Sequence, residues 1–202
     1  MITSMFNSYE HTIVITNRHL VQGDFLKQLE KVTKLHPHAL ILREKDLTDD
    51  AYESLAKKVF DLCEREDITF FLHTKIEIAR KIGCQNIHLS IPVLKGLSET
   101  EKKALTEDFC EISISCHSME DVEIAMAGGA TQIILGTIFE TECKKGVLGK
   151  GVEFVREICQ KCPLPVYAIG GMNLQRLHLV IDAGAAGCCM MSGFMQTTKT
   201  LQ

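Results

Sequence analysis

Hydrophobic residues along the chain gather in eight short runs, and the stretches between them carry apolar residues at helical spacing. The runs are rich in Ile, Val and Leu, which is typical of parallel strands that are buried on both faces. They cover residues 12–16, 39–43, 69–73, 86–90, 112–116, 131–136, 165–169 and 187–191. The intervening pattern predicts helices over residues 24–36, 49–66, 75–83, 98–108, 118–128, 151–162 and 173–184.

Residues suited to helix ends support several of these boundaries. Thr48 and Ser118 each stand before acidic residues that suit the first turn of a helix, and Asn173 precedes the last helical pattern. Gly184 follows that pattern and is expected to end the helix.

Eight strands alternating with helices predict an α/β fold, a single (β/α)8 TIM barrel that occupies residues 1–202 as one domain. The alternative is an open doubly wound sheet, which usually has fewer strands and a glycine-rich turn after the first one. Here the first strand runs into Thr-Asn-Arg-His-Leu, which favours the barrel. Only residues 195–202 remain for the eighth helix, which is therefore expected to be short or missing.

Composition narrows the class of protein. A net charge of -4 argues against a dedicated nucleic-acid binder, and no apolar run is long enough to cross a membrane. The N-terminus shows no signal-peptide pattern, and the nine cysteines are an odd number without small-domain spacing. We therefore expect a cytoplasmic protein with reduced thiols. Cys159 and Cys162 form a Cys-x-x-Cys motif without a second pair, so a structural role is expected and no metal site.

Polar residues at two strand ends are candidates for binding and proton transfer. Alternation puts Arg43 and Lys45 on one side at the end of the second strand, where two cations form an anion site. The alternative is a pair of surface charges neutralised by the neighbouring acids. Ser115 and His117 share a face of the fifth strand, so His117 is either an acid/base or phosphate partner or a hydrogen-bonded strand-end histidine.

Three later segments carry phosphate-binding chemistry. The loop after the sixth strand combines Thr141 and Lys144 with nearby glycines, which suits either a phosphate site with a lid or a plain flexible loop. The seventh strand ends in Gly170 and Gly171, which let a ligand approach the main chain. Ser192 follows the eighth strand and is expected to open a short helix. A phosphate site after strands seven and eight recurs in TIM barrels.

These blocks resemble the thiamine-phosphate synthase/TenI family over nearly the whole chain. The matching blocks are LREKDL (42–47), SCHSMEDVEIA (115–125), GTIFETECKKG (136–146), PVYAIGGM (165–172) and GAAGCCMMSG (184–193). The resemblance implies a (β/α)8 barrel that holds the phosphate of a thiazole phosphate at Gly171, Met191 and Ser192. In the synthase branch it also implies pyrophosphate contacts, which would fall on Arg43, Lys45, Ser115, Thr141, Cys143 and Lys144.

The chain departs from the synthase pattern where that branch binds magnesium. Where synthases have an Asn-Asp pair, this chain has His73-Thr74, and where they have a further Asp it has Val93. Neither Thr nor Val can balance the charge of a magnesium pyrophosphate. The glutamine that recognises the pyrimidine is replaced by Ile41. This pattern looks like the TenI branch, which isomerises a thiazole carboxylate phosphate without a metal. The catalytic histidine of that branch corresponds to Thr137, which cannot titrate near neutral pH.

The sequence therefore predicts a TenI-like thiazole tautomerase of thiamine biosynthesis without a cofactor, in which His73 or His117 moves the proton. His88, inside the fourth strand, is expected to belong to the hydrophobic core. The expected substrate contacts are Arg43, Lys45, Ser115, Thr137, Thr141, Lys144, Gly170, Gly171, Met191 and Ser192. The alternatives are a Mg²⁺-dependent thiamine-phosphate synthase and a non-catalytic phosphate-ligand or regulatory protein. The expected partner is a small thiazole phosphate, with no nucleic acid or membrane, and a short final helix leaves a flank that a second copy could cover.

Overall fold

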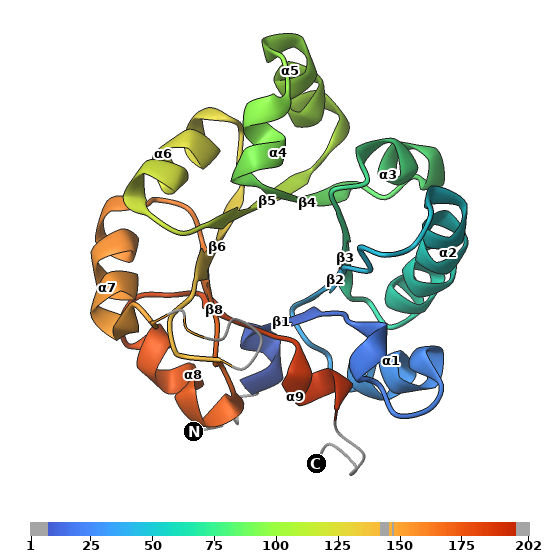
Figure 1. Cartoon of the computed structure of the whole chain (residues 1–202), viewed down its shortest axis with the longest axis horizontal. Helices are drawn as coiled ribbons and strands as arrows, with labels where there is room; N and C mark the ends of the chain where they lie inside the picture. Colours follow the sequence, from blue (N-terminus) through green and yellow to red (C-terminus); the bar gives the residue numbers. More distant parts are fainter. Residues whose placement is uncertain (1–7, 142–145, 147, 197–202) are drawn as a thin grey trace, which may run out of the picture.

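Figure 1 shows a closed barrel of parallel strands with the helices around its outside. The computed structural model describes residues 8–141, 146 and 148–196. The strands are β1 (Thr12–Ile15), β2 (Ala39–Leu42), β3 (Thr69–His73), β4 (Asn86–Ser90), β5 (Glu111–Cys116), β6 (Gln132–Gly136), β7 (Val166–Ile169) and β8 (Gly187–Met190). Neighbouring strands pair in chain order, and β1 pairs with β8 to close the barrel. The predicted TIM barrel is confirmed.

The helices also follow the predicted order. They are α1 (Phe25–Thr33), α2 (Asp49–Arg65), α3 (Ile76–Ile82), α4 (Ile91–Gly96), α5 (Glu99–Asp108), α6 (Met119–Ala127), α7 (Gly151–Lys161), α8 (Leu174–Ile181) and α9 (Ser192–Met195), with 3-10 turns at Ser8–His11 and Arg18–Leu20. The short helix α4 was not predicted. It has a proline in its first turn, and its Ile91 and Leu94 are buried. Within the described residues, every helix is too short or too polar to span a lipid bilayer.

The expected capping residues start three of the helices. Thr48, Ser118 and Asn173 each accept a hydrogen bond from a backbone N–H in the first turn, at 3.4, 3.1 and 2.9 Å. Helix α8 ends at Ile181, and Gly184 follows with a φ of +102°. The short helix expected to open at Ser192 is present as α9, whereas most of residues 195–202, expected to hold at most a short eighth helix, lies outside the described residues.

Alternate strand residues face the interior of the barrel. Below the carboxyl ends of the strands, the interior contains an apolar cluster of Ile13, Ile15, Ala39, Ile41, Phe71, Ile134, Tyr167 and Cys189. The opposite faces of the strands pack against the helices in a second, larger cluster. Because the alternation continues to the strand ends, side chains two residues further along face the mouth.

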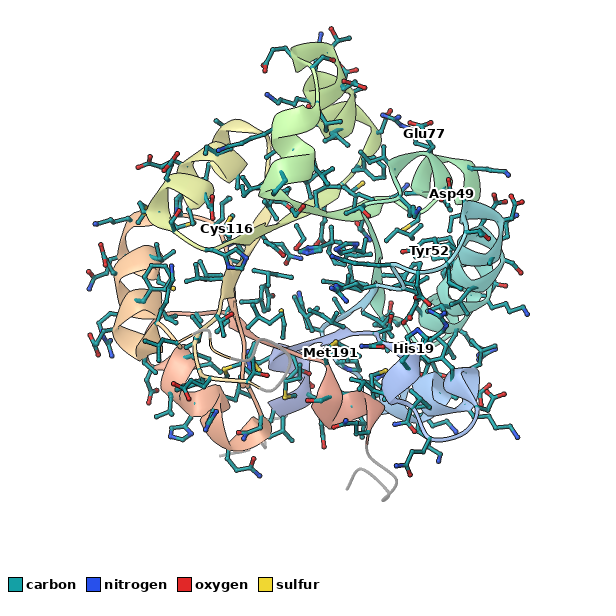
Figure 2. The ribbon with its side chains drawn as sticks, viewed as in Figure 1. His19, Asp49, Tyr52, Glu77, Cys116 and Met191 are labelled. Atoms are coloured by element: carbon teal, nitrogen blue, oxygen red, sulfur yellow. The ribbon has the colours of Figure 1, made fainter. Side chains whose placement is uncertain are left out.

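Tyr52 of α2 joins the ends of two strands. Its side chain is buried. Figure 2 shows Tyr52 between α2 and β3. The hydroxyl donates to the Leu42 carbonyl oxygen at 2.6 Å and accepts from the His73 backbone N–H at 3.2 Å. Helix α2 therefore fixes the positions at which Arg43 and His73 enter the mouth.

Replacing Tyr52 by Phe should lower the free energy of unfolding by about 1–3 kcal/mol, because two buried backbone groups lose their partner. Urea unfolding of both proteins measures the difference. Tyr167→Phe is the matched control, since Tyr167 is buried and its hydroxyl makes no hydrogen bond within the described part of the chain. Equal losses in the two variants would contradict this role of Tyr52.

Candidate functional site

The carboxyl ends of the strands bring most of the expected site residues to one end of the barrel. Arg43 follows β2, His73 ends β3, and Ser115 lies near the end of β5. Gly170 and Met191 follow β7 and β8. Parallel strands in one barrel all end on the same side, so these residues line its mouth (Figure 1).

The acidic neighbours of Arg43 are bound elsewhere. The buried Glu44 carboxylate accepts hydrogen bonds from the Thr16 hydroxyl at 2.7 Å and from the Arg18 backbone N–H at 3.0 Å, and it also pairs with the Arg18 guanidinium. Asp46 pairs with the same guanidinium and with His19, which Figure 2 labels beside β1.

Arg43 is consequently available to an anion. Among the described residues, no carboxylate forms an ion pair with its half-buried side chain. The alternative that Glu44 and Asp46 neutralise it is therefore wrong, and an anion site at this side of the mouth is favoured. Lys45 is exposed in the loop after Arg43.

His73 and His88 lie side by side on β3 and β4. They are paired in the strand register, and their ring centroids are 5.6 Å apart. His88 is 4% exposed, as the core prediction required, but its partners are polar. Its Nδ1 lies 2.9 Å from Ser113 Oγ and its Nε2 lies 2.9 Å from Ser115 Oγ. His88 thus contacts a residue of the candidate site, which the sequence prediction missed.

Both rings resist protonation. Burial and, to a smaller extent, the charges of Arg43 and Lys45 together lower the pKa of His73 to about 4. Burial likewise lowers the pKa of His88 to about 3, with smaller effects from His73 and Arg43. Both imidazoles are therefore neutral near pH 7.

His117 follows β5 and reaches across to β6. Its Nδ1 donates to the Gly136 carbonyl oxygen at 2.6 Å, and its backbone N–H donates to the Asp121 carboxylate at 2.7 Å. The Lys150 ammonium group donates to the His117 carbonyl oxygen. Because a carbonyl oxygen only accepts, Nδ1 carries a proton and Nε2 of the neutral ring is a proton acceptor. Within the described residues no contact joins His117 and His73; His73 lies beside His88 instead.

Gly170 and Gly171 allow a close approach between two main-chain segments. Their φ values are +101° and +60°, a region that favours glycine. A Cβ at Gly170 would lie 2.4 Å from Thr137 Cγ2, and one at Gly171 would lie 2.5 Å from the Glu140 carbonyl oxygen. Thr137 is buried in this contact. Packing between β7 and the segment after β6 therefore accounts for both glycines, independently of any ligand.

The remaining expected residues lie around β8 and the loop after β6. Met191 is half-buried next to the start of α9, as its label in Figure 2 shows, and Ser192 is the exposed first residue of that helix. Gln28 Nε2 donates to the Phe194 carbonyl oxygen at 2.6 Å, which attaches α9 to α1. Thr141 is half-buried at the start of its loop. Cys143 and Lys144 lie outside the described residues.

The positions that correspond to magnesium ligands do not fit the ion. Thr74 donates its hydroxyl to the His73 carbonyl oxygen at 2.7 Å, and Val93 packs against the core from α4. Over the described ranges, no group of three His, Cys, Asp or Glu side chains could hold a metal ion. A divalent cation with its pyrophosphate needs charged oxygen ligands, which this part of the mouth lacks.

Comparison with known proteins places the chain among its relatives. The family model described as "Thiamine monophosphate synthase" matches residues 12–194. A "Putative thiamine-phosphate synthase 2" of Aquifex aeolicus is 29% identical, over 90% of this chain and 96% of that protein. A thiamine-phosphate synthase of Coprothermobacter proteolyticus is 30% identical, over 89% and 84%.

A solved structure shares the barrel. The thiamine phosphate pyrophosphorylase of Pyrococcus furiosus superimposes with a TM-score of 0.81 at 22% identity, covering 96% of this chain and 91% of that one. At this identity the likeness shows the fold alone. The sequence match covers nearly every element of the barrel and its mouth, and on that ground the chain belongs to the thiamine monophosphate synthase (TMP-TENI) family.

Proposed function

We propose that this chain is a thiazole tautomerase of the TenI type, which binds a thiazole phosphate and moves a proton on its ring without a metal. The observation that carries the proposal is the contact of His117 with Gly136. The TenI resemblance puts the catalytic histidine at the next residue, Thr137. His117 brings an imidazole to the same end of β6 from the neighbouring strand.

The geometry of His117 suits a general base. The hydrogen bond from Nδ1 to the Gly136 carbonyl oxygen leaves Nε2 to accept a proton from a carbon of the substrate ring. The same imidazole then returns the proton to another ring atom, so no atom or electron is gained or lost overall. The neighbouring strands β7 and β8 carry Gly171, Met191 and Ser192, which would hold the phosphate.

His73 is less suited to be the base. Its lowered pKa of about 4 makes it a weak proton acceptor, and it stands on the other side of the mouth beside Arg43. A neutral imidazole there can still donate or accept a hydrogen bond to the ligand. We therefore assign proton transfer to His117, and a contact with the substrate to His73.

The synthase alternative has one observation in its favour. Arg43 has no carboxylate partner in the described structure, and an unpaired guanidinium suits a pyrophosphate as well as a carboxylate. The residues at Thr74 and Val93 count against it, because they supply no charged ligand for magnesium. The non-catalytic alternative differs from both enzymes in that the protein would bind the ligand without turning it over.

The purified protein should accelerate aromatisation of the thiazole carboxylate phosphate in the presence of EDTA. His117→Ala should lower kcat by a factor of about 10²–10⁴, the usual contribution of a general base. His178→Ala, on the exposed side of α8, is the control and should leave kcat unchanged. No acceleration by the intact protein would refute the tautomerase, and tight ligand binding without turnover would favour the non-catalytic alternative.

Arg43→Met should raise the pKa of His73 from about 4 towards the ordinary value near 6.5, because the variant removes a positive charge that disfavours the imidazolium. An NMR titration of the His73 ring measures the shift. The control is Arg65→Met, which removes an exposed arginine at the end of α2 and should leave the pKa of His73 unchanged. An unchanged pKa would contradict the placement of Arg43. If His73 were the base, the acidic limb of the pH–rate profile would move by the same amount, and such a movement would contradict the assignment of proton transfer to His117.

Thiamine phosphate formation should be absent when the protein is given the pyrimidine diphosphate, the thiazole phosphate and Mg²⁺. The physical reason is the missing charged ligand set at Thr74 and Val93. Product formation is measured by chromatography. Robust turnover would show that carboxylates from another part of the chain hold the metal.

A further inference from the structure

Three polar side chains form a continuous hydrogen-bonded chain inside the barrel. Ser113 Oγ lies 2.9 Å from His88 Nδ1, and His88 Nε2 lies 2.9 Å from Ser115 Oγ. Ser113 is fully buried, His88 is 4% exposed, and Ser115 is half-buried two residues nearer the mouth. The chain therefore runs from the closed interior of the barrel towards the site.

Burial of Ser113 fixes the direction of the first hydrogen bond. A buried hydroxyl needs an acceptor for its proton, because leaving it unpaired costs about 1–3 kcal/mol. Within the described residues, His88 Nδ1 is the only hydrogen-bond partner of this hydroxyl. Gln132 faces Ser113 in the register of β5 and β6, but within the described residues no hydrogen bond joins the two side chains. Ser113 consequently donates to His88 Nδ1.

The direction of the first hydrogen bond determines the second. The buried His88 ring is neutral and carries one N–H, so an accepting Nδ1 leaves the proton on Nε2. The Nε2–H group then donates to Ser115 Oγ. Ser115 uses its oxygen as the acceptor of this bond, and its own O–H is left for a ligand in the mouth.

We propose that His88 and Ser113 are positioning residues that make Ser115 a hydrogen-bond donor to an anionic oxygen of the ligand. This inference rests on the proposed function and extends it to the substrate's second anionic group, opposite the phosphate side of the mouth. The neighbouring Arg43 and His73 suit the same chemistry, because a guanidinium and a neutral imidazole both donate to a carboxylate or phosphate oxygen. The opposite tautomer of His88 would make Ser115 an acceptor and select a different ligand group.

The tautomer of His88 can be measured without any ligand or turnover. Long-range ¹H–¹⁵N correlation spectra should show the proton on Nε2 and an unprotonated Nδ1. Ser113→Ala removes the donor to Nδ1 and should shift the equilibrium towards the other tautomer. A proton on Nδ1 in the unaltered protein would overturn the inference.

Two substitutions of His88 separate the two hydrogen bonds. The Gln amide nitrogen can occupy the position of Nε2 and donate to Ser115, whereas the Asn amide reaches only the position of Nδ1. His88→Gln should therefore bind the thiazole carboxylate phosphate about tenfold more tightly than His88→Asn, as expected for one hydrogen bond to a charged group. Equal affinities in two variants with matching melting temperatures would contradict a role in positioning Ser115.

Ser115→Ala identifies the anionic group that is bound. Calorimetry with the thiazole carboxylate phosphate, the thiazole phosphate without the carboxylate, and inorganic phosphate supplies the three measurements. A loss of about tenfold or more for the first ligand alone assigns Ser115 to the carboxylate, and a loss for all three would assign it to the phosphate and overturn its placement at the second anionic group. Unchanged affinity for every ligand would overturn the inference. Binding that depends on Ser115 without any turnover would support the inference while refuting the tautomerase.

Discussion

The closed barrel imposes one constraint on which the candidate site depends, because every strand residue must face either the interior or the surrounding helices. The interior below the carboxyl ends of the strands is packed with apolar side chains such as Ile41 and Phe71. Polar side chains on the same face are concentrated near the carboxyl ends, where Ser115 and His73 are half-buried. Chemistry on this fold therefore arises from a few positions per strand, and neighbouring strands determine which of them meet.

The strands were predictable because each is a short run rich in Ile, Val and Leu. Such runs are typical of parallel strands that are buried on both faces. The helix α4 was not predictable in the same way, since a six-residue helix with Pro92 in its first turn shows no repeated helical spacing. The sequence indicated most of the residues of the candidate site, but not the side-chain pairs that they form. Arg43 is available because Glu44 is bound by Arg18, and His88 is polar in its surroundings because Ser113 and Ser115 come from the next strand. Such pairings join residues that are distant in the chain, so they depend on strand register rather than on local pattern.

Membership of the family leaves the reaction open, because one scaffold accommodates different chemistry at the same mouth. The relatives in the comparison carry the name of the synthase, whereas this chain has Thr74 and Val93 where charged ligands are needed. Thr74 and Val93 supply no charged ligand for magnesium, which is why we favour a reaction without a metal. In the proposed tautomerase, the phosphate would be held beside β7 and β8, and His117, which follows β5 and contacts the end of β6, would move the proton without a metal. Under this proposal the base comes from the strand next to β6, while the position that the TenI resemblance assigns to the catalytic histidine is Thr137.

Arg18 has a consequence for the electrostatics of the mouth although it lies in the turn after β1, outside the set of expected ligand contacts. Its guanidinium pairs with both Glu44 and Asp46, the two carboxylates nearest to Arg43 in the chain. If Arg43 binds the ligand as proposed, Arg18 supports that affinity indirectly, by engaging charges that would otherwise compete with the ligand. An exchange of the Arg18 side chain would then weaken anion binding although no residue that contacts the ligand had changed.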